Sequence, residues 1–127
     1  MKWDSDGSFL VSGSTDRTVK IWTTYGGASR PLQNYDNHKG GVNVVQWGPP
    51  GAKGNRLLAS CSDDGTALLW DVEYGKVLHV LDGKKMRAFT AMSFSPNGKL
   101  IATGDQDGVV QIWSTKVSHL CMHVSKL

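Results

Sequence analysis

Three side chains near the middle of the chain have the residue types of a hydrolase active site. His38, Ser60 and Asp64 could act as a triad, in which the imidazole activates the hydroxyl and the carboxylate orients the imidazole. The same groups could instead form a hydrogen-bond chain inside the protein, because a buried imidazole or hydroxyl must find partners. The sequence around them separates these two hypotheses.

The segment that contains Ser60 and Asp64 occurs three times in the chain. Each copy has a Ser or Thr, an Asp four positions later and a Trp six positions after the Asp. The copies span residues 10–22, 58–70 and 101–113, and their Trp residues lie 48 and 43 positions apart. A repeat of this length is typical of proteins built from several similar structural units.

The repetition favours a structural role for these side chains. A packing device recurs in every unit, whereas a catalytic triad is not copied into each one. The His belongs to the second unit alone, because Lys85 takes its position in the third unit and the equivalent position in the first would precede Met1. We therefore predict a structural hydrogen-bond network and no enzymatic activity. The members of this network are His38, Ser60, Asp64 and Trp70 in unit two, Ser12, Asp16 and Trp22 in unit one, and Thr103, Asp107 and Trp113 in unit three.

Each unit also carries short apolar segments that predict strands and no helix. These segments are bounded by Gly, Asn, Asp or Pro, whereas a helix would need about ten or more periodic residues. Asp-Gly or Asn-Gly pairs at 6–7, 64–65, 97–98 and 107–108 predict tight hairpins. The expected strands are 1–3, 8–14, 18–22 and 31–35 in unit one, 42–48, 56–62, 66–72 and 76–81 in unit two, and 89–95, 99–105, 109–114 and 118–124 in unit three.

Two sets of aromatic residues recur at fixed positions in these strands. Trp22, Trp70 and Trp113 share one position. The other position is shared by Trp3, Trp47 and Phe94. We expect both sets to pack between neighbouring units.

Four-stranded units that repeat every 40 to 45 residues or so and end in Trp-Asp are typical of β-propeller blades. With His38, Ser60, Asp64 and Trp70-Asp71 in its second unit, the chain resembles the WD40 repeat family. Shorter stretches, among them Lys2-Trp3-Asp4, are similar to the transducin β-like corepressor subfamily. The resemblance implies an all-β fold of three four-stranded antiparallel blades in an open arc, with the first strand of the first blade truncated.

The expected organisation is one partial propeller domain over residues 1–127, with blades at about 1–36, 37–83 and 84–127. Propellers usually have about four to eight blades. We therefore expect this chain to be a piece of a larger propeller, or an arc that closes its ring by self-association or with further blades.

The resemblance implies a protein-interaction scaffold that needs no cofactor or metal. It places the protein-binding face on the hairpins before each repeated Asp and on the loops that enter the first strands. The face residues are Thr15, Asp63 and Gln106 in the hairpins, and Lys39, Gly41, Met86 and Ala88 in the loops. The expected partners are proteins or peptides, and the closer likeness would make them corepressor or deacetylase subunits that regulate transcription in the nucleus.

Two other binding chemistries are weaker hypotheses. Lys84, Lys85 and Arg87 form a basic loop that could bind nucleic acid weakly, although it lacks neighbouring exposed aromatic side chains for base stacking except Phe89, which the pattern places in a strand. His119, Cys121 and His123 alternate and would share one face of a strand, but three ligands without a fourth favour an ordinary edge strand.

The composition sets the outer limits. A chain of 127 residues with a net charge of +3 allows one domain and only permits nucleic acid as a partner. No apolar run approaches the roughly 18 residues of a membrane-spanning helix. With two cysteines and no secretory signal, we expect an intracellular protein, nuclear or cytoplasmic, without a membrane partner.

Overall fold

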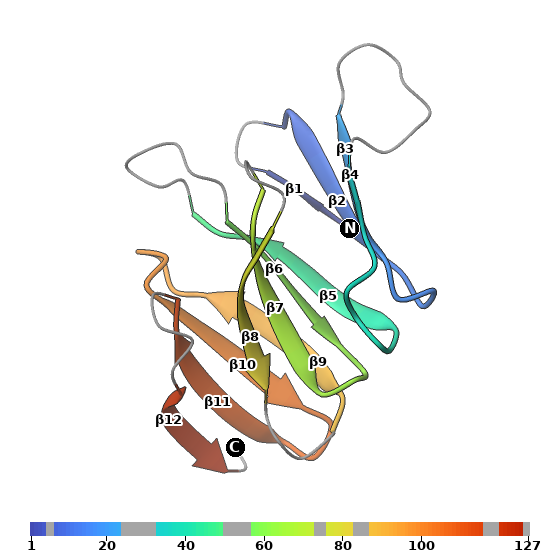
Figure 1. The fold of residues 1–127 in the computed structure, drawn as a ribbon. Coiled ribbons are helices and arrows are strands. Elements are labelled where there is room, and N and C mark those ends of the chain that lie inside the picture. The colour runs from blue at the N-terminus through green and yellow to red at the C-terminus, as the bar shows by residue number, and fades with distance from the viewer. Residues whose placement is uncertain are drawn as a thin grey trace.

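The computed structural model describes residues 1–4, 7–23, 33–49, 57–72, 76–82, 87–115 and 120–125, and every regular element in these ranges is a strand (Figure 1). The first four are β1 (Lys2–Trp3), β2 (Phe9–Gly13), β3 (Val19–Thr23) and β4 (Gln33–Tyr35). The next four are β5 (Val42–Trp47), β6 (Leu57–Ser62), β7 (Thr66–Asp71) and β8 (Lys76–Asp82). The last four are β9 (Phe89–Phe94), β10 (Leu100–Asp105), β11 (Val109–Ser114) and β12 (Leu120–Ser125).

The strands form three four-stranded antiparallel sheets, in the orders β1-β2-β3-β4, β5-β6-β7-β8 and β9-β10-β11-β12. The sequence repeat is also a repeat of register, because Leu10 pairs with Trp22 in the first sheet just as Leu58 pairs with Trp70 in the second. The all-β prediction of three four-stranded blades is confirmed. The first strand of the first sheet has two residues, where its counterparts β5 and β9 have six.

The sheets stack side by side as an open arc, with the sheet β5–β8 in the middle (Figure 1). Two hydrophobic clusters join them, because alternate side chains of the middle sheet point to opposite faces. The first cluster packs Val11 and Ile21 of the first sheet against Leu58 and Trp70 of the second. The second cluster packs middle-sheet residues such as Leu69 and Leu81 against Phe89, Ile101 and Trp113 of the third sheet.

The prediction that Trp3 packs between units is wrong. Trp47 is buried and its indole Nε1 donates a hydrogen bond to the carbonyl of Lys2 at 3.1 Å, but the Trp3 side chain is 57 % exposed. Trp3 lies on β1, the two-residue strand at the edge of the first sheet. Together with Trp47 and Phe94 it lines a cavity of about 310 Å³ at this end of the inner strands.

One hairpin contains a residue in an unfavourable backbone conformation. Arg17 has a φ of 77°, and glycines occupy the equivalent turn positions, Gly65 with a φ of 81° and Gly108 with a φ of 84°. A Cβ is strained in this left-handed region. We expect Arg17→Gly to raise the free energy of unfolding by about 0.5–1 kcal/mol in urea denaturation. The mirror variant Gly65→Ala should lower it by about 1 kcal/mol, and opposite signs would contradict this account.

Candidate protein-binding face and the hydrogen-bond chain beneath it

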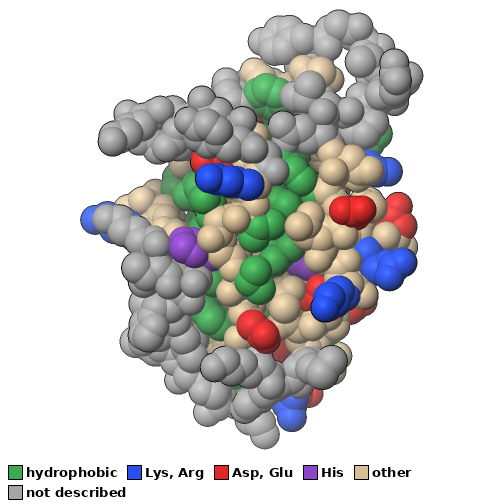
Figure 2. Space-filling model, in the orientation of Figure 1, with side chains coloured by type: hydrophobic (Ala, Val, Ile, Leu, Met, Phe, Trp, Pro, Cys, Tyr) green, Lys and Arg blue, Asp and Glu red, His purple; other side chains and the backbone are tan. Residues whose placement is uncertain are grey.

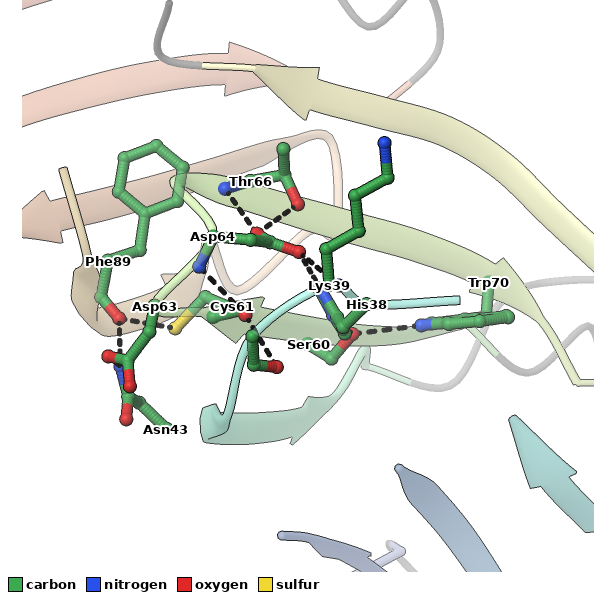
Figure 3. Close-up of polar contacts among 12 residues, drawn as sticks. His38, Lys39, Asn43, Ser60, Cys61, Asp63, Asp64, Thr66, Trp70 and Phe89 are labelled. Atoms are coloured by element: carbon green, nitrogen blue, oxygen red, sulfur yellow. Dashed lines mark hydrogen bonds and ion pairs between the residues drawn. The ribbon is translucent and has the colours of Figure 1, made fainter. Parts of the chain in front are cut away.

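A hydrogen-bond chain crosses the middle sheet from its core to its hairpin edge (Figure 3). The indole N–H of Trp70 donates to Ser60 Oγ at 3.0 Å, and Ser60 Oγ lies 2.7 Å from His38 Nε2. The other ring nitrogen of His38, Nδ1, lies 3.1 Å from Asp64 Oδ2. With His38 neutral and its proton on Nδ1, every bond of this series joins one donor to one acceptor: Trp70 donates to Ser60, Ser60 donates to His38 and His38 donates to Asp64.

The order of these groups matches a catalytic triad, but their surroundings do not suit catalysis. Ser60 is 0 % exposed and His38 is 4 % exposed, so a substrate has no access to the hydroxyl. The Ser60 oxygen also accepts the indole N–H of Trp70, which holds it in the core. The arrangement can pair buried polar atoms and fix the position of a loop.

Asp64 connects this chain to the surface loops. Its Oδ2 accepts the backbone N–H of Lys39 at 2.9 Å, and its Oδ1 accepts both the N–H and the hydroxyl of Thr66, at 2.8 and 2.6 Å. Burial alone would raise the pKa of this carboxyl, but the bonds from Thr66, Lys39 and His38 outweigh burial and hold the pKa below its usual 3.8. The loop before β5 and the β6–β7 hairpin are therefore held by one ionised side chain.

The buried imidazole predicts a pH dependence of stability. Burial lowers the pKa of His38 below its usual 6.5, although Asp64 opposes this shift. The unfolded chain then binds a proton more readily than the folded one, so the free energy of unfolding should fall as the pH drops below 6.5. Urea denaturation at a series of pH values measures this slope. His38→Gln, which keeps the other histidines, should flatten it between about pH 6.5 and 5, and an unchanged slope would contradict the assignment.

The first and third sheets repeat part of this arrangement. Trp22 donates to Ser12 Oγ at 3.0 Å, and Trp113 donates to Thr103 Oγ1 at 2.9 Å. In the first sheet Asp16 Oδ1 accepts the Thr18 N–H at 3.1 Å, as Asp64 does with Thr66. Hydrogen bonds from Thr18 and Ser14 hold the pKa of the exposed Asp16 carboxyl below its usual value.

The third sheet replaces this turn by a different set of bonds. Val109 stands where the other sheets have Thr18 and Thr66, and it has no hydroxyl to offer an Asp. Instead Asp105 Oδ1 accepts the backbone N–H groups of Asp107 and Val109, at 2.9 and 3.0 Å.

Asp107 is thereby available for another contact, and it forms an ion pair with Arg87 at the exposed edge. Sequence reasoning placed Arg87 only in a basic loop and missed this partner. The signal in the sequence that could have indicated this ion pair is Val109, which stands where the other two units have a Thr. Lys85, at the position of the missing His, lies outside the described residues.

The hairpins β2–β3, β6–β7 and β10–β11 lie along one edge of the molecule, at the lower right of Figure 1. Charged side chains of both signs lie toward this edge in Figure 2. Of the predicted face residues, Thr15, Asp63, Gln106 and Lys39 are exposed, Gly41 and Ala88 are half-buried, and Met86 lies outside the described residues.

Backbone hydrogen bonds join each of these hairpins to a neighbouring loop. The N–H of Asp63 donates to the Gly41 carbonyl at 2.9 Å, and the N–H of Gln106 donates to the Ala88 carbonyl at 3.1 Å. Between the first two sheets, the Val42 N–H donates to the Ser14 carbonyl at 2.9 Å. The edge is therefore a set of positioned loops with exposed polar side chains.

Asn43 joins two sheets at this edge, and sequence reasoning did not single it out. Its Nδ2 donates to Asp63 Oδ1 at 2.8 Å and to the carbonyl of Phe89 at 2.9 Å. The first acceptor belongs to the middle sheet and the second begins the third sheet. An Asn at an exposed strand position carries no motif, so its role follows only from the packing of the sheets.

The metal hypothesis stays untested at its own residues. His119 lies outside the described residues, and Cys121 and His123 lie in β12, whose side chains are not described. Within the ranges given above, no group of three His, Cys, Asp or Glu side chains could hold a metal ion. The described part of the chain also contains no helix that could cross a membrane.

The Cys61 thiol lies in the core between the second and third sheets and is 0 % exposed. Burial raises its pKa to about 12, so it carries no thiolate at neutral pH. In a Cys121→Ser background, we expect Cys61 to react with an aromatic disulfide reagent only after denaturation. Rapid labelling of the folded protein would contradict the packing of these two sheets.

Stacked four-stranded meanders, each with an indole bonded to a Ser or Thr, define the blades of a β-propeller protein. The family described as "WD domain, G-beta repeat" matches residues 1–23, 29–71 and 75–114. The chain therefore belongs to the WD40 repeat family, as the sequence resemblance implied.

Similar proteins come from several plants. The guanine nucleotide-binding protein subunit beta of Oryza sativa subsp. japonica is 31 % identical over 129 residues, which cover 97 % of this chain and 33 % of that protein. The small ribosomal subunit protein RACK1y of the same organism is 38 % identical over 104 residues, covering 82 % of this chain and 28 % of that protein. The pre-mRNA-processing factor 19 homolog 2 of Arabidopsis thaliana is 31 % identical over 118 residues, covering 91 % and 22 %. The chain spans about a third or less of the length of these relatives.

Proposed function

We propose that this chain is a non-catalytic scaffold that binds other proteins through its hairpin edge. The observation that carries the proposal is the recurrence of exposed side chains, Thr15, Asp63 and Gln106, at equivalent hairpin positions of three adjacent sheets. Each of these hairpins is fixed by buried or backbone hydrogen bonds, so its exposed side chains are presented in a defined geometry. A surface that is ordered before binding loses little conformational freedom when a partner docks.

The chemistry of the edge favours a partner with polar groups of both charges. Lys39 and Asp63 are both exposed at this edge, and Arg87 and Asp107 form an exposed pair further along. Such a mixed surface fits a peptide or a folded protein better than a polyanion. The names of two relatives describe subunits of larger assemblies, which supports the same class of function.

The finer hypotheses remain predictions. A likeness to the transducin β-like corepressors would place the partners among corepressor and deacetylase subunits in the nucleus, and an intracellular location suits a buried free thiol. For nucleic acid, the guanidinium of Arg87 is already paired with Asp107, and Lys84 and Lys85 lie outside the described residues. The pairing of Arg87 favours protein over nucleic acid as the ligand.

A comparison of bound partners tests the proposal. The face variant carries Asp63→Lys and Gln106→Glu, a charge reversal and a new charge on exposed hairpin positions. The control variant carries Lys99→Glu and Pro96→Lys, the same two kinds of change at exposed positions of the opposite end. Proteins cross-linked to each variant in a plant cell extract are then quantified against the native chain.

We expect the face variant to lose, by about tenfold or more, partners that the control variant retains. Equal recovery by both variants would reject the hairpin edge as the binding surface. Urea denaturation of both variants checks that each keeps its fold, because Asp63→Lys also removes an acceptor of the Asn43 amide.

A further inference from the structure

We propose that Asn97-Gly98 is a site of spontaneous isoaspartate formation, and that the turn around it permits the reaction only when this turn opens. The two residues belong to the turn that joins β9 to β10, at the end of the third sheet away from the hairpin edge (Figure 1). Asn97 is exposed, and it is the asparagine of this chain that precedes a glycine. The modification is independent of the proposed binding function.

The reaction needs only the protein and water. The backbone nitrogen of Gly98 loses its proton and attacks Cγ of Asn97, so that an N–Cγ bond forms, the Cγ–Nδ2 bond breaks and ammonia leaves with the proton. Water then opens the resulting succinimide ring at either of its carbonyls. One opening gives aspartate, and the other gives isoaspartate, in which the main chain runs through the side-chain carbons. Gly98 favours the attack because it has no Cβ to crowd its nitrogen.

The backbone of the turn holds Asn97 in a conformation that prevents ring closure. The Gly98 N–H donates to the Ser95 carbonyl at 2.9 Å, and Pro96 and Asn97 between them both have a negative φ. A hydrogen-bonded turn of this kind is type I, with a ψ of about 0° at its third residue. Ring closure needs Asn97 Cβ and Gly98 N on the same side of the Cα–C bond, but at this ψ they lie about 120° apart around it. The main chain must therefore rotate at Asn97 before the ring can form, and this rotation breaks the bond to Ser95.

Hydrogen bonds also hold the side-chain carbonyl of Asn97. Its Oδ1 accepts the Lys99 N–H at 3.0 Å and the Ser95 hydroxyl at 2.7 Å. The Ser95 oxygen in turn accepts the Leu100 N–H at 3.0 Å, so it connects this side chain to the start of β10. The rotation that ring closure needs moves the Lys99 N–H away from Oδ1, so this bond opposes the reaction as well.

Neighbouring segments hold the Gly98 peptide in place. The Thr115 hydroxyl, just after β11, donates to the Gly98 carbonyl at 2.8 Å. The turn also contacts the segment that follows β5, because a Cβ built on Gly98 would lie 3.0 Å from Cγ of Pro49. Opening of the turn is therefore a local unfolding event that breaks several contacts at once.

The two products should affect the turn differently. Aspartate keeps the Oδ1 acceptor, and the first unit has Asp6 at the equivalent position of its sequence. Isoaspartate adds one carbon to the main chain at residue 97, so the four-residue turn can no longer close through the bond from Gly98 to Ser95. Molecules that have formed isoaspartate should therefore keep this end of the β9–β10 hairpin open.

The rates of isoaspartate formation in the folded and the unfolded chain provide the first test. The full chain is incubated at mildly alkaline pH, in buffer and in denaturing guanidinium chloride. Isoaspartate at residue 97 is then measured by digestion and mass spectrometry with electron-transfer fragmentation. We expect the reaction to be at least about tenfold faster in denaturant. Equal rates in the two solutions, or no isoaspartate at residue 97 in denaturant, would overturn the proposal.

Ser95→Ala tests the role of the turn in the folded protein. It removes the hydroxyl that bonds Asn97 Oδ1 and the Leu100 N–H. The rate in buffer should rise by about threefold or more, while the rate in denaturant stays the same. Ser93→Ala is the matched control, because Ser93 is exposed on β9 and its hydroxyl lies 3.4 Å from the adjacent Phe94 carbonyl. The control should react at the native rate in both solutions.

Thr115→Val is a second variant that acts on the same peptide from outside the turn. It releases the Gly98 carbonyl and should also raise the rate in buffer without changing the rate in denaturant. Circular dichroism in buffer checks that each variant is folded. A folded Ser95→Ala or Thr115→Val that reacts at the native rate in buffer would show that these hydrogen bonds do not control the reaction, and would overturn the proposal.

Discussion

Replacing Ser60 by alanine is expected to lower the free energy of unfolding by about 2–4 kcal/mol. The hydroxyl accepts the Trp70 indole N–H and bonds His38 Nε2, and all three side chains are buried. Alanine leaves a donor and an acceptor without this partner in a place that water does not reach. Urea denaturation followed by far-UV circular dichroism measures the loss.

Ser12→Ala is the matched control for this substitution. It removes the same bond to an indole, that of Trp22, but on a half-exposed face where water can replace it. Its cost should be about 1 kcal/mol or less in the same urea denaturation. Equal losses of unfolding free energy in the two variants would show that the hydrogen-bond chain from Trp70 to Asp64 does not act as a buried unit.

Trp70→Ala should be the more damaging of the two central substitutions, at about 3–5 kcal/mol. The indole is 1 % exposed and stacks on Tyr35, with ring centroids 4.3 Å apart and planes inclined by 29°. Its removal leaves a cavity between the first two sheets and takes the indole donor away from Ser60, which keeps only its bond to His38. Thermal unfolding followed by circular dichroism measures the change.

Two further variants separate packing from hydrogen bonding at Trp70. Trp70→Phe keeps an aromatic ring against Tyr35 but loses the indole N–H and part of the ring volume, so it should cost less than Trp70→Ala. Trp22→Ala removes the equivalent, half-buried indole and should also cost less. A Trp22→Ala variant as unstable as Trp70→Ala would mean that burial between sheets is not what makes Trp70 important.

The strands and sheets could be predicted because their signals are local and repeated. Alternating apolar residues indicate strands directly, and the glycines at positions 7, 65, 98 and 108 all adopt the positive φ that the predicted hairpins require. Because the pattern occurs three times at similar spacing, it also shows which segments of the three units are equivalent. Register followed from this equivalence, as the pairs Leu10 with Trp22 and Leu58 with Trp70 show.

The parts of the site that sequence could not predict depend on contacts between units. The pair of Arg87 and Asp107 forms because Asp105 takes over the turn, which is an exchange among three side chains at once. The exposure of Trp3 depends on which sheet lies beside it, and not on its own position in the repeat. The spacing of a motif along the sequence does not show which side chain or sheet lies beside it, so neither feature could be predicted from that spacing.

The two acceptors of Asn43 have a consequence for what the hairpin edge selects. One amide nitrogen directs its two hydrogens to Asp63 in one sheet and to the Phe89 carbonyl in the next. A ligand that drew Asp63 outward would have to stretch its bond to Asn43, and that work would be subtracted from the affinity of the ligand. The hairpin edge should therefore select ligands by shape. Ligands that fit the loops in their present positions should bind more tightly than ligands that require the loops to move.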